Sequence, residues 1–151
     1  CSAIVFYGLG TEILIKQEQE LIVFSILCYS MSGICLGFLK HNSYPAKIFM
    51  GDTGSLSIGA IMGSIAILTN SVFTLSIFSG IFIIESLSVM IQVSFFKITK
   101  KLFHNGKRVF LMAPLHHHFE LKGVKEHKIV ENFWKINILL VILGIVLKIN
   151  L

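Results

Sequence analysis

A run of nineteen residues without a single charged side chain, residues 21–39, limits what this chain can fold into more than any other feature. At 1.5 Å per residue, a helix of this length crosses a hydrocarbon core of about 30 Å. Apolar residues make up 54% of the 151 and charged residues 14%, whereas a soluble domain has roughly a quarter charged. Because lipid requires backbone groups to be satisfied within a segment, we expect an all-α, polytopic integral membrane helical bundle.

Further apolar stretches divide the chain into membrane spans and polar loops. We expect four complete spans, over residues 21–39, 53–69, 72–96 and 132–149, and the tail of a fifth over residues 1–10. Residues 11–20 form a polar connector, and the larger loops cover residues 40–55 and 97–130. Because the sequence opens on Cys1 in apolar sequence without a targeting segment, we interpret all 151 residues as the C-terminal part of one integral membrane domain. The Gly59-x-x-x-Gly63 spacing suggests close helix packing.

Basic residues concentrate in the two larger loops, which orients the chain in the membrane. These loops contain Lys40, Lys47, Lys97, Lys100, Lys101, Lys107, Arg108, Lys122, Lys125 and Lys128. The positive-inside rule places both loops in the cytoplasm and the acidic 11–20 connector outside. Since the net charge of +5 reflects orientation, we expect the lipid bilayer and no nucleic acid as a partner.

The chain's only aspartate, Asp52, lies in a glycine-containing loop between two apolar segments. Thr53 and Ser55 can cap a helix that starts at about Leu56. A helix N-terminus beside glycines suits a phosphate group, and a carboxylate there can hold a hard cation such as Mg²⁺. A plain turn between two buried helices explains the same residues, and local chemistry does not separate the two interpretations.

A second cluster, His116, His117 and His118, lies between Pro114 and Gly123 in the long loop. Consecutive histidines rarely converge on one metal ion, but they can bind phosphates and sugar hydroxyls or move protons near neutral pH. The alternative is a solvated basic loop at the lipid headgroups. We interpret His41, His104 and His127 as ordinary interfacial residues.

Glu85 is the one charged residue in the middle of the longest apolar stretch. An ionisable residue inside a membrane is a functional candidate. We favour a structural role in helix packing, because we expect Glu85 to lie about half a bilayer away from the loops. Cys28 and Cys35 are expected to be free thiols within one span.

Two motifs together, residues 45–56 and 112–123, resemble the phospho-N-acetylmuramoyl-pentapeptide transferases, a family within the polyprenyl-phosphate sugar-1-phosphate transferases. The resemblance implies transfer of phospho-N-acetylmuramoyl-pentapeptide from UDP-MurNAc-pentapeptide to undecaprenyl phosphate, with release of UMP. It also implies Mg²⁺ as cofactor and a multi-pass protein of the bacterial cytoplasmic membrane, with its active site on the cytoplasmic face.

The resemblance also assigns roles to single residues. It implies that Asp52 serves as catalytic residue and metal ligand, and that the three consecutive histidines, His116, His117 and His118, line the nucleotide-sugar site. The implied substrate-binding residues are Asn42, Gly51, Thr53, Gly54, Ser55 and Lys122.

The sequence departs from the family pattern in several places. The family carries an adjacent pair of aspartates in its N-terminal half, whereas Asp52 stands alone here, so we expect this chain to be inactive by itself. Val124 and Asn132 stand where the family has Trp and Arg.

Other functions are retained as alternatives. A related UDP-N-acetylhexosamine:polyprenyl-phosphate transferase shares the aspartate loop. A transporter would use Glu85 and Gln92 as a polar path, and a non-catalytic membrane remnant would need neither motif. A second copy of the chain, as a homodimer, is a further candidate partner.

Overall fold

The computed structural model describes residues 1–103 and 105–150, with the backbone alone for residues 103 and 150. His104, predicted to be an interfacial histidine, lies outside the described residues. Within them every regular element is helical. The elements are α1 (Ser2–Ile15), the short 3₁₀ helix η1 (Gln19–Leu21), α2 (Ile22–Asn42), α3 (Asp52–Leu68), α4 (Val72–Phe78), α5 (Gly80–Phe103), α6 (Leu115–Leu121) and α7 (Glu126–Asn150). The predicted all-α class is therefore confirmed.

Contacts divide the chain into two compact units. Unit 1 comprises Cys1–Ser79 together with Trp134–Leu151, and unit 2 comprises Gly80–Phe133. Unit 1 therefore contains the Asp52 loop, and unit 2 contains the three consecutive histidines.

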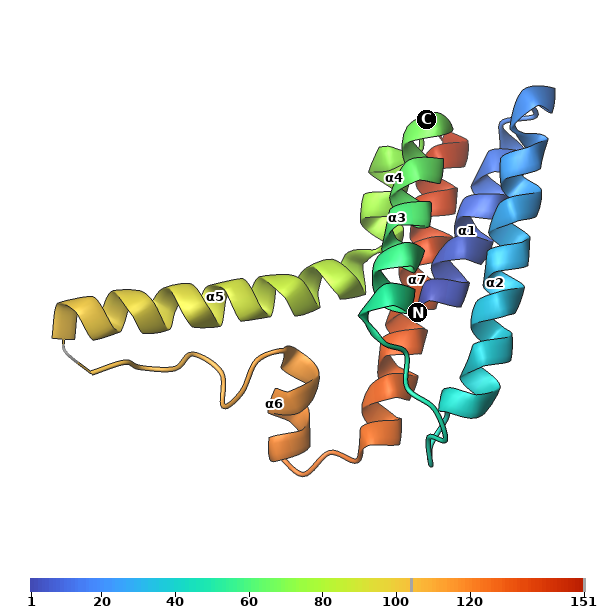
Figure 1. Ribbon diagram of the computed structural model, residues 1–151. Coiled ribbons are helices and arrows are strands. Elements are labelled where there is room, and N and C mark those ends of the chain that lie inside the picture. Colours follow the sequence, from blue (N-terminus) through green and yellow to red (C-terminus); the bar gives the residue numbers. More distant parts are fainter. Residues whose placement is uncertain (104, 151) are drawn as a thin grey trace. The chain divides into compact units, whose positions relative to one another are not determined.

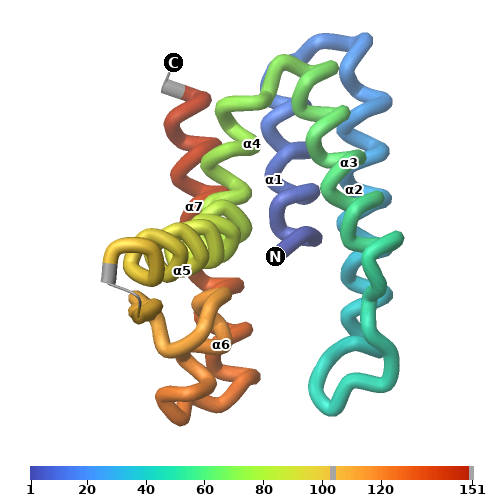
Figure 2. Tube along the Cα trace, turned by 60° about the vertical axis from the view of Figure 1, so that its left-hand side comes forward, coloured from blue at the N-terminus to red at the C-terminus, as the bar shows by residue number. Residues whose placement is uncertain are grey.

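The core of unit 1 forms around α1. Val5, Phe6, Leu9 and Ile13 of this helix are fully or almost fully buried. They pack with Cys28 of α2, Met62 and Ile65 of α3, Phe78 of α4 and Val141 of α7. Figures 1 and 2 show α1 among these helices. Residues 1–10 were expected to be the tail of a span, yet they form the buried centre of this unit.

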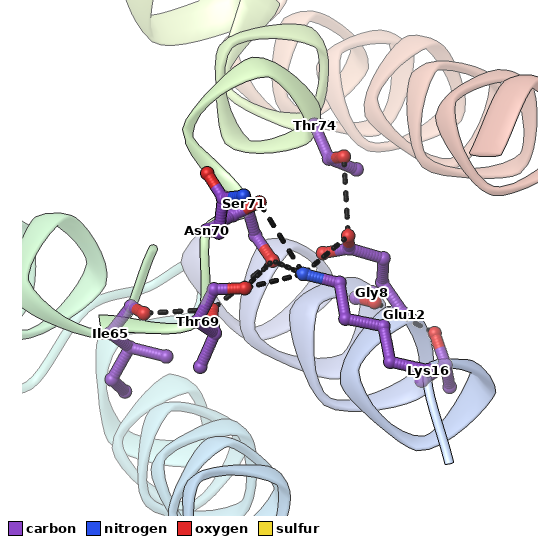
Figure 3. Close-up of polar contacts among 9 residues, drawn as sticks. Gly8, Glu12, Lys16, Ile65, Thr69, Asn70, Ser71 and Thr74 are labelled. Atoms are coloured by element: carbon purple, nitrogen blue, oxygen red, sulfur yellow. Dashed lines mark hydrogen bonds and ion pairs between the residues drawn. The ribbon is translucent and has the colours of Figure 1, made fainter. Parts of the chain in front are cut away.

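The polar connector expected over residues 11–20 is wrong in its first part, because α1 continues to Ile15. Glu12 is fully buried, and the Nζ of Lys16 lies 3.5 Å from its Oε1. Lys16 also donates to the carbonyl of Thr69 and, at 2.9 Å, to the hydroxyl of Ser71, while Thr74 donates to Glu12 at 3.4 Å (Figure 3). The ion pair and the hydrogen bond to Oε1 offset part of the cost of burying this carboxylate, whereas Oε2 has no hydrogen-bond partner among the described residues. The contacts of Lys16 connect α1 to the turn between α3 and α4.

Three helices among the described residues have the length and hydropathy to cross a membrane: Gln19–Asn42, Gly80–Leu102 and Glu126–Ile149. The apolar helices α1 and α3 are shorter. The stretch 72–96, expected to be one span, contains two helices separated by Ser79. Gly80, directly after this break, is a poor helix former, which hydropathy alone does not register.

Close packing occurs at other glycines than the sequence suggested. A Cβ added at Gly59 or Gly63 would meet nothing within 4 Å among the described residues. A Cβ at Gly8 of α1 would lie 2.7 Å from Val141, and one at Gly144 of α7 would lie 2.6 Å from the Phe78 ring. The predicted packing motif in α3 is therefore wrong within this chain, and α1, α4 and α7 make the close approach instead.

Candidate functional site

Asp52 is the first residue of α3, and its side chain is exposed. Gly51 precedes it as the N-cap in an extended conformation, with φ −78° and ψ 177°. No side chain caps this helix start among the described residues. The positive end of the helix dipole favours a carboxylate at this position and also favours a bound anion.

The predicted caps, Thr53 and Ser55, are wrong because the helix begins earlier than Leu56. The hydroxyl of Ser55 donates to the carbonyl of Asp52 at 3.1 Å, so both residues already lie inside the first turn. Gly54 is needed for packing, since a Cβ there would lie 2.8 Å from the side chain of Met50. The glycine thus lets the loop fold against the start of α3.

Asn42, the last residue of α2, organises the loop before Asp52. Its side-chain amide donates to the carbonyl of Ile48 at 2.9 Å. Asn42 and Met50 also line a mainly apolar cavity of about 380 Å³, together with Ile58 of α3 and Trp134 of α7. An apolar cavity therefore lies within unit 1, next to the loop that precedes the exposed carboxylate.

The three consecutive histidines lie on the short helix α6, preceded by Pro114 as its N-cap. At its C-terminus, Gly123 adopts a φ of 87°, and its N–H donates to the carbonyl of Glu120 at 2.8 Å. The N–H of Val124 donates to the carbonyl of Phe119 at 3.1 Å. This pair of bonds with a left-handed glycine is a Schellman motif, which ends the helix at Leu121 with Lys122 as its C-cap.

Glu85 contacts the histidine helix, contrary to the expected distance of half a bilayer. Its Oε2 lies 3.1 Å from Nδ1 of His116, and its side chain is 17% exposed. Because α5 begins at Gly80, Glu85 lies in the second turn of that helix instead of the middle of a long span. Its second oxygen, Oε1, is buried without a hydrogen-bond partner among the described residues. Glu85 therefore belongs to the candidate site, and its contact with His116 does not fit the purely structural role expected from the sequence.

The other two histidines have different partners for the same ring atom. Nδ1 of His117 lies 2.8 Å from Oε2 of Glu120, within α6. Nδ1 of His118 instead accepts a hydrogen bond from the backbone N–H of Leu111 at 3.1 Å. Each of the three rings is thus fixed at Nδ1 by a neighbour.

His118 lines a cavity of about 510 Å³ that also has two basic residues, Arg108 and Lys122, in its wall. The guanidinium and ammonium groups together supply positive charge, and the imidazole supplies a further polar contact. Such a set of side chains suits an anionic ligand such as a phosphate. The sequence identifies Arg108 only as one of the basic loop residues, because no local pattern places it beside His118.

The described residues contain no group of three or more His, Cys, Asp or Glu side chains that could hold a metal ion. Asp52 can still supply one ligand, since Mg²⁺ usually takes one or two protein carboxylates and completes its shell with water and substrate phosphates. An exposed carboxylate at a helix start fits that use. The three histidines have nitrogen donors, which Mg²⁺ does not favour.

Comparison with known proteins places these features in context. The first part of the chain, residues 1–70, matches the model of Glycosyl transferase family 4. Over its full 151 residues, the chain is 92% identical to a phospho-N-acetylmuramoyl-pentapeptide-transferase of Prochlorococcus marinus (strain MIT 9312). The aligned part covers 42% of that protein. A protein of the same name from Synechococcus sp. (strain CC9605) is 48% identical over 148 residues, which are 98% of this chain and 42% of the relative. The chain thus spans less than half the length of these curated relatives.

Proposed function

We propose that this chain is part of a phospho-N-acetylmuramoyl-pentapeptide transferase, as its identity to proteins of that name indicates. The whole protein would transfer phospho-N-acetylmuramoyl-pentapeptide from its UDP carrier to undecaprenyl phosphate, releasing UMP. The observation that carries the proposal is the 92% identity over all 151 residues with a transferase of that name. Because the chain covers 42% of that relative, the proposal concerns the whole protein. We expect the 151 residues by themselves to be inactive, since Asp52 is their only aspartate.

We assign Asp52 to the reacting diphosphate, as one ligand of a Mg²⁺ ion. When bound, the cation would neutralise charge on the diphosphate. The support is an exposed carboxylate at the first residue of α3, beside backbone N–H groups at a helix start. These N–H groups and Gly51 allow a phosphate oxygen to approach the backbone. Thr53, Gly54 and Ser55 remain predicted substrate contacts.

The apolar cavity next to the Asp52 loop supports a lipid acceptor. Its wall combines Asn42 at the end of α2 with apolar side chains of α1, α3 and α7. A polyprenyl phosphate needs hydrocarbon contacts for its chain and cationic contacts for its phosphate. Unit 1 offers hydrocarbon contacts in this cavity, next to the loop that leads to Asp52, and the Mg²⁺ ion that Asp52 would hold would supply the positive charge for the phosphate.

The histidine helix and its basic cavity support binding of the nucleotide donor. Arg108, His118 and Lys122 line one cavity, and His116 is paired with Glu85. Phosphoryl transfer depends mainly on positioning and charge neutralisation, so we assign these side chains to binding rather than to proton transfer. The lysine count of the loops supports a cytoplasmic position for both motifs.

The test is an assay of the full-length protein in reconstituted vesicles with undecaprenyl phosphate and Mg²⁺. We expect UMP release with UDP-MurNAc-pentapeptide and no competition by UDP-N-acetylglucosamine. Efficient turnover of UDP-N-acetylglucosamine would instead favour the related N-acetylhexosamine transferase. Solute flux without UMP release would favour the transporter alternative.

A further inference from the structure

The segment between α5 and α6 runs back along α5 (Figure 1), and three side chains of that helix hold it there. The hydroxyl of Thr99 accepts a hydrogen bond from the N–H of Lys107 at 2.9 Å. Phe96 packs so closely on Gly106 that a Cβ there would lie 2.3 Å from the ring. Gln92 holds the next part of the segment. These three residues are spaced four and three apart and therefore lie on one face of α5.

Gln92 makes three hydrogen bonds to the backbone of this segment. Its Oε1 accepts from the N–H of Val109 at 3.0 Å and from the N–H of Phe110 at 2.9 Å. Its Nε2 donates to the carbonyl of Phe110 at 3.0 Å. The amide supplies an acceptor oxygen and a donor nitrogen together, so neither an ionised carboxylate nor an apolar side chain reproduces all three bonds.

The residue that follows, Leu111, is the one whose N–H donates to Nδ1 of His118. An Nδ1 that accepts a hydrogen bond carries no proton, so His118 in this arrangement is neutral and protonated at Nε2. The Nδ1 atoms of His116 and His117 face carboxylate oxygens, and an ionised carboxylate favours a proton on the Nδ1 that faces it. We therefore expect Nδ1 to be a donor in His116 and His117 and an acceptor in His118.

We propose that Gln92 is a positioning residue for His118. By fixing the backbone of Val109 and Phe110, it directs the N–H of Leu111 at Nδ1 of His118 and holds that ring as an Nε2–H donor. His118 thus enters the wall of the cavity it shares with Arg108 and Lys122 as a hydrogen-bond donor to an anion and not as a base. Only the identity of that anion, a phosphate of the nucleotide donor, rests on the proposed function.

The geometry also separates this role from the earlier alternative of a polar path through the membrane. Three of the four hydrogen-bonding positions of the Gln92 amide are directed to backbone groups of one segment, so both acceptor positions and one N–H are already used. A residue lining a transport path would keep most of these positions for a solute or water.

The experiment uses full-length protein labelled with ¹⁵N and reconstituted in lipid, at a pH above the ordinary imidazole titration range. We expect His118 to show an unprotonated Nδ1 with scalar coupling to the amide nitrogen of Leu111, and His116 to show a protonated Nδ1. In Gln92→Leu the coupling to His118 should disappear, and amide exchange of Val109 and Phe110 should rise about tenfold or more, given the typical worth of one lost hydrogen bond.

Two further variants serve as a graded comparison and as a control. Gln92→Glu has the same shape and retains the two acceptor bonds but loses the donor bond to Phe110, so it should give a smaller rise in exchange. Ser94→Ala, an exposed position on the same helix, should change neither readout. Retention of the His118 coupling in Gln92→Leu, or a proton on Nδ1 of His118 in the wild type, would overturn the proposal.

Activity then separates this inference from the proposed function. In an active wild type, Gln92→Leu should raise the KM for UDP-MurNAc-pentapeptide at least several-fold, and more than it lowers kcat. A wild type that shows the predicted spectra but releases no UMP would refute the proposed function and leave the positioning role intact. An unchanged KM with loss of the coupling would show that His118 is not a donor contact, and the proposal would fail.

Discussion

The Glu85–His116 pair offers the most informative perturbation, because its coupling energy can be worked out from the structure. Oε2 and Nδ1 lie 3.1 Å apart, and the two side chains are 17% and 39% exposed. Exposed ion pairs contribute about 0–1 kcal/mol and hydrogen bonds to charged groups about 1.5–3 kcal/mol. A partly exposed pair should therefore couple by about 1–2 kcal/mol, which is roughly a 5- to 30-fold effect.

A double-mutant cycle measures this coupling. It compares kcat/KM for UMP release among the wild type, Glu85→Leu, His116→Ala and the double variant. Each single variant should lower kcat/KM, and the double variant should be close to the slower of the two. The cycle is preferable to one variant, because the unpaired buried Oε1 of Glu85 makes removal of this carboxylate partly favourable for stability. Effects that add within about 0.5 kcal/mol would refute the pairing.

A matched cycle controls for general disturbance of α5. Ser86 is one residue further along the helix, is exposed, and its hydroxyl donates to the carbonyl of Phe82 at 2.9 Å. The Ser86→Ala variant should therefore combine additively with His116→Ala. Thermal unfolding of all variants shows whether a loss of kcat/KM reflects loss of folded protein.

Three further predictions concern the fold and orientation. Lys16→Met should destabilise the chain by about 3–5 kcal/mol in thermal unfolding, because it leaves Glu12 buried and unpaired. Gly144→Ala should cost about 1–3 kcal/mol, because its Cβ would lie 2.6 Å from a buried phenylalanine ring. With native cysteines replaced, a cysteine probe at Gln17 should be labelled from outside intact cells and one at Asn105 should not.

Each of these three predictions has a control variant or a result that would refute it. Removing both partners of the buried pair, with Glu12→Leu and Lys16→Met, should cost less than Lys16→Met alone. Gly33→Ala should be neutral or stabilising, since a Cβ there meets nothing within 4 Å among the described residues. External labelling at Asn105 would invert the orientation and remove the cytoplasmic site.

Sequence reasoning predicted the helical class because that class follows from a property of each residue. A long uncharged segment such as residues 21–39 must satisfy its own backbone in lipid, so hydropathy is enough to predict α2 as a helix. Hydropathy did not separate α4 from α5, since Ser79 and Gly80 interrupt the helix without lowering the apolar character much. Because this break was not predicted, Glu85 was expected in the middle of a long span, whereas it lies near the start of α5.

The contacts of the candidate site could not be predicted from the sequence, for a different reason. Glu85 and His116 are 31 residues apart and lie on different helices, and no local pattern marks them as partners. Glu12 was assigned to an acidic connector because two further glutamates, Glu18 and Glu20, follow it, whereas its burial and its contact with Thr74 of α4 decide its environment. The roles of Asp52 and of the predicted substrate contacts remain predictions.

The central claim is that Asp52 serves the cation and diphosphate of a phospho-sugar transfer. The most direct test is UMP release by full-length Asp52→Asn, with UDP-MurNAc-pentapeptide, undecaprenyl phosphate and saturating Mg²⁺, at membrane levels equal to the wild type. The amide keeps the shape of the side chain but loses its charge, so we predict that UMP release nearly disappears while membrane insertion is unchanged. Turnover close to that of the wild type would contradict the claim.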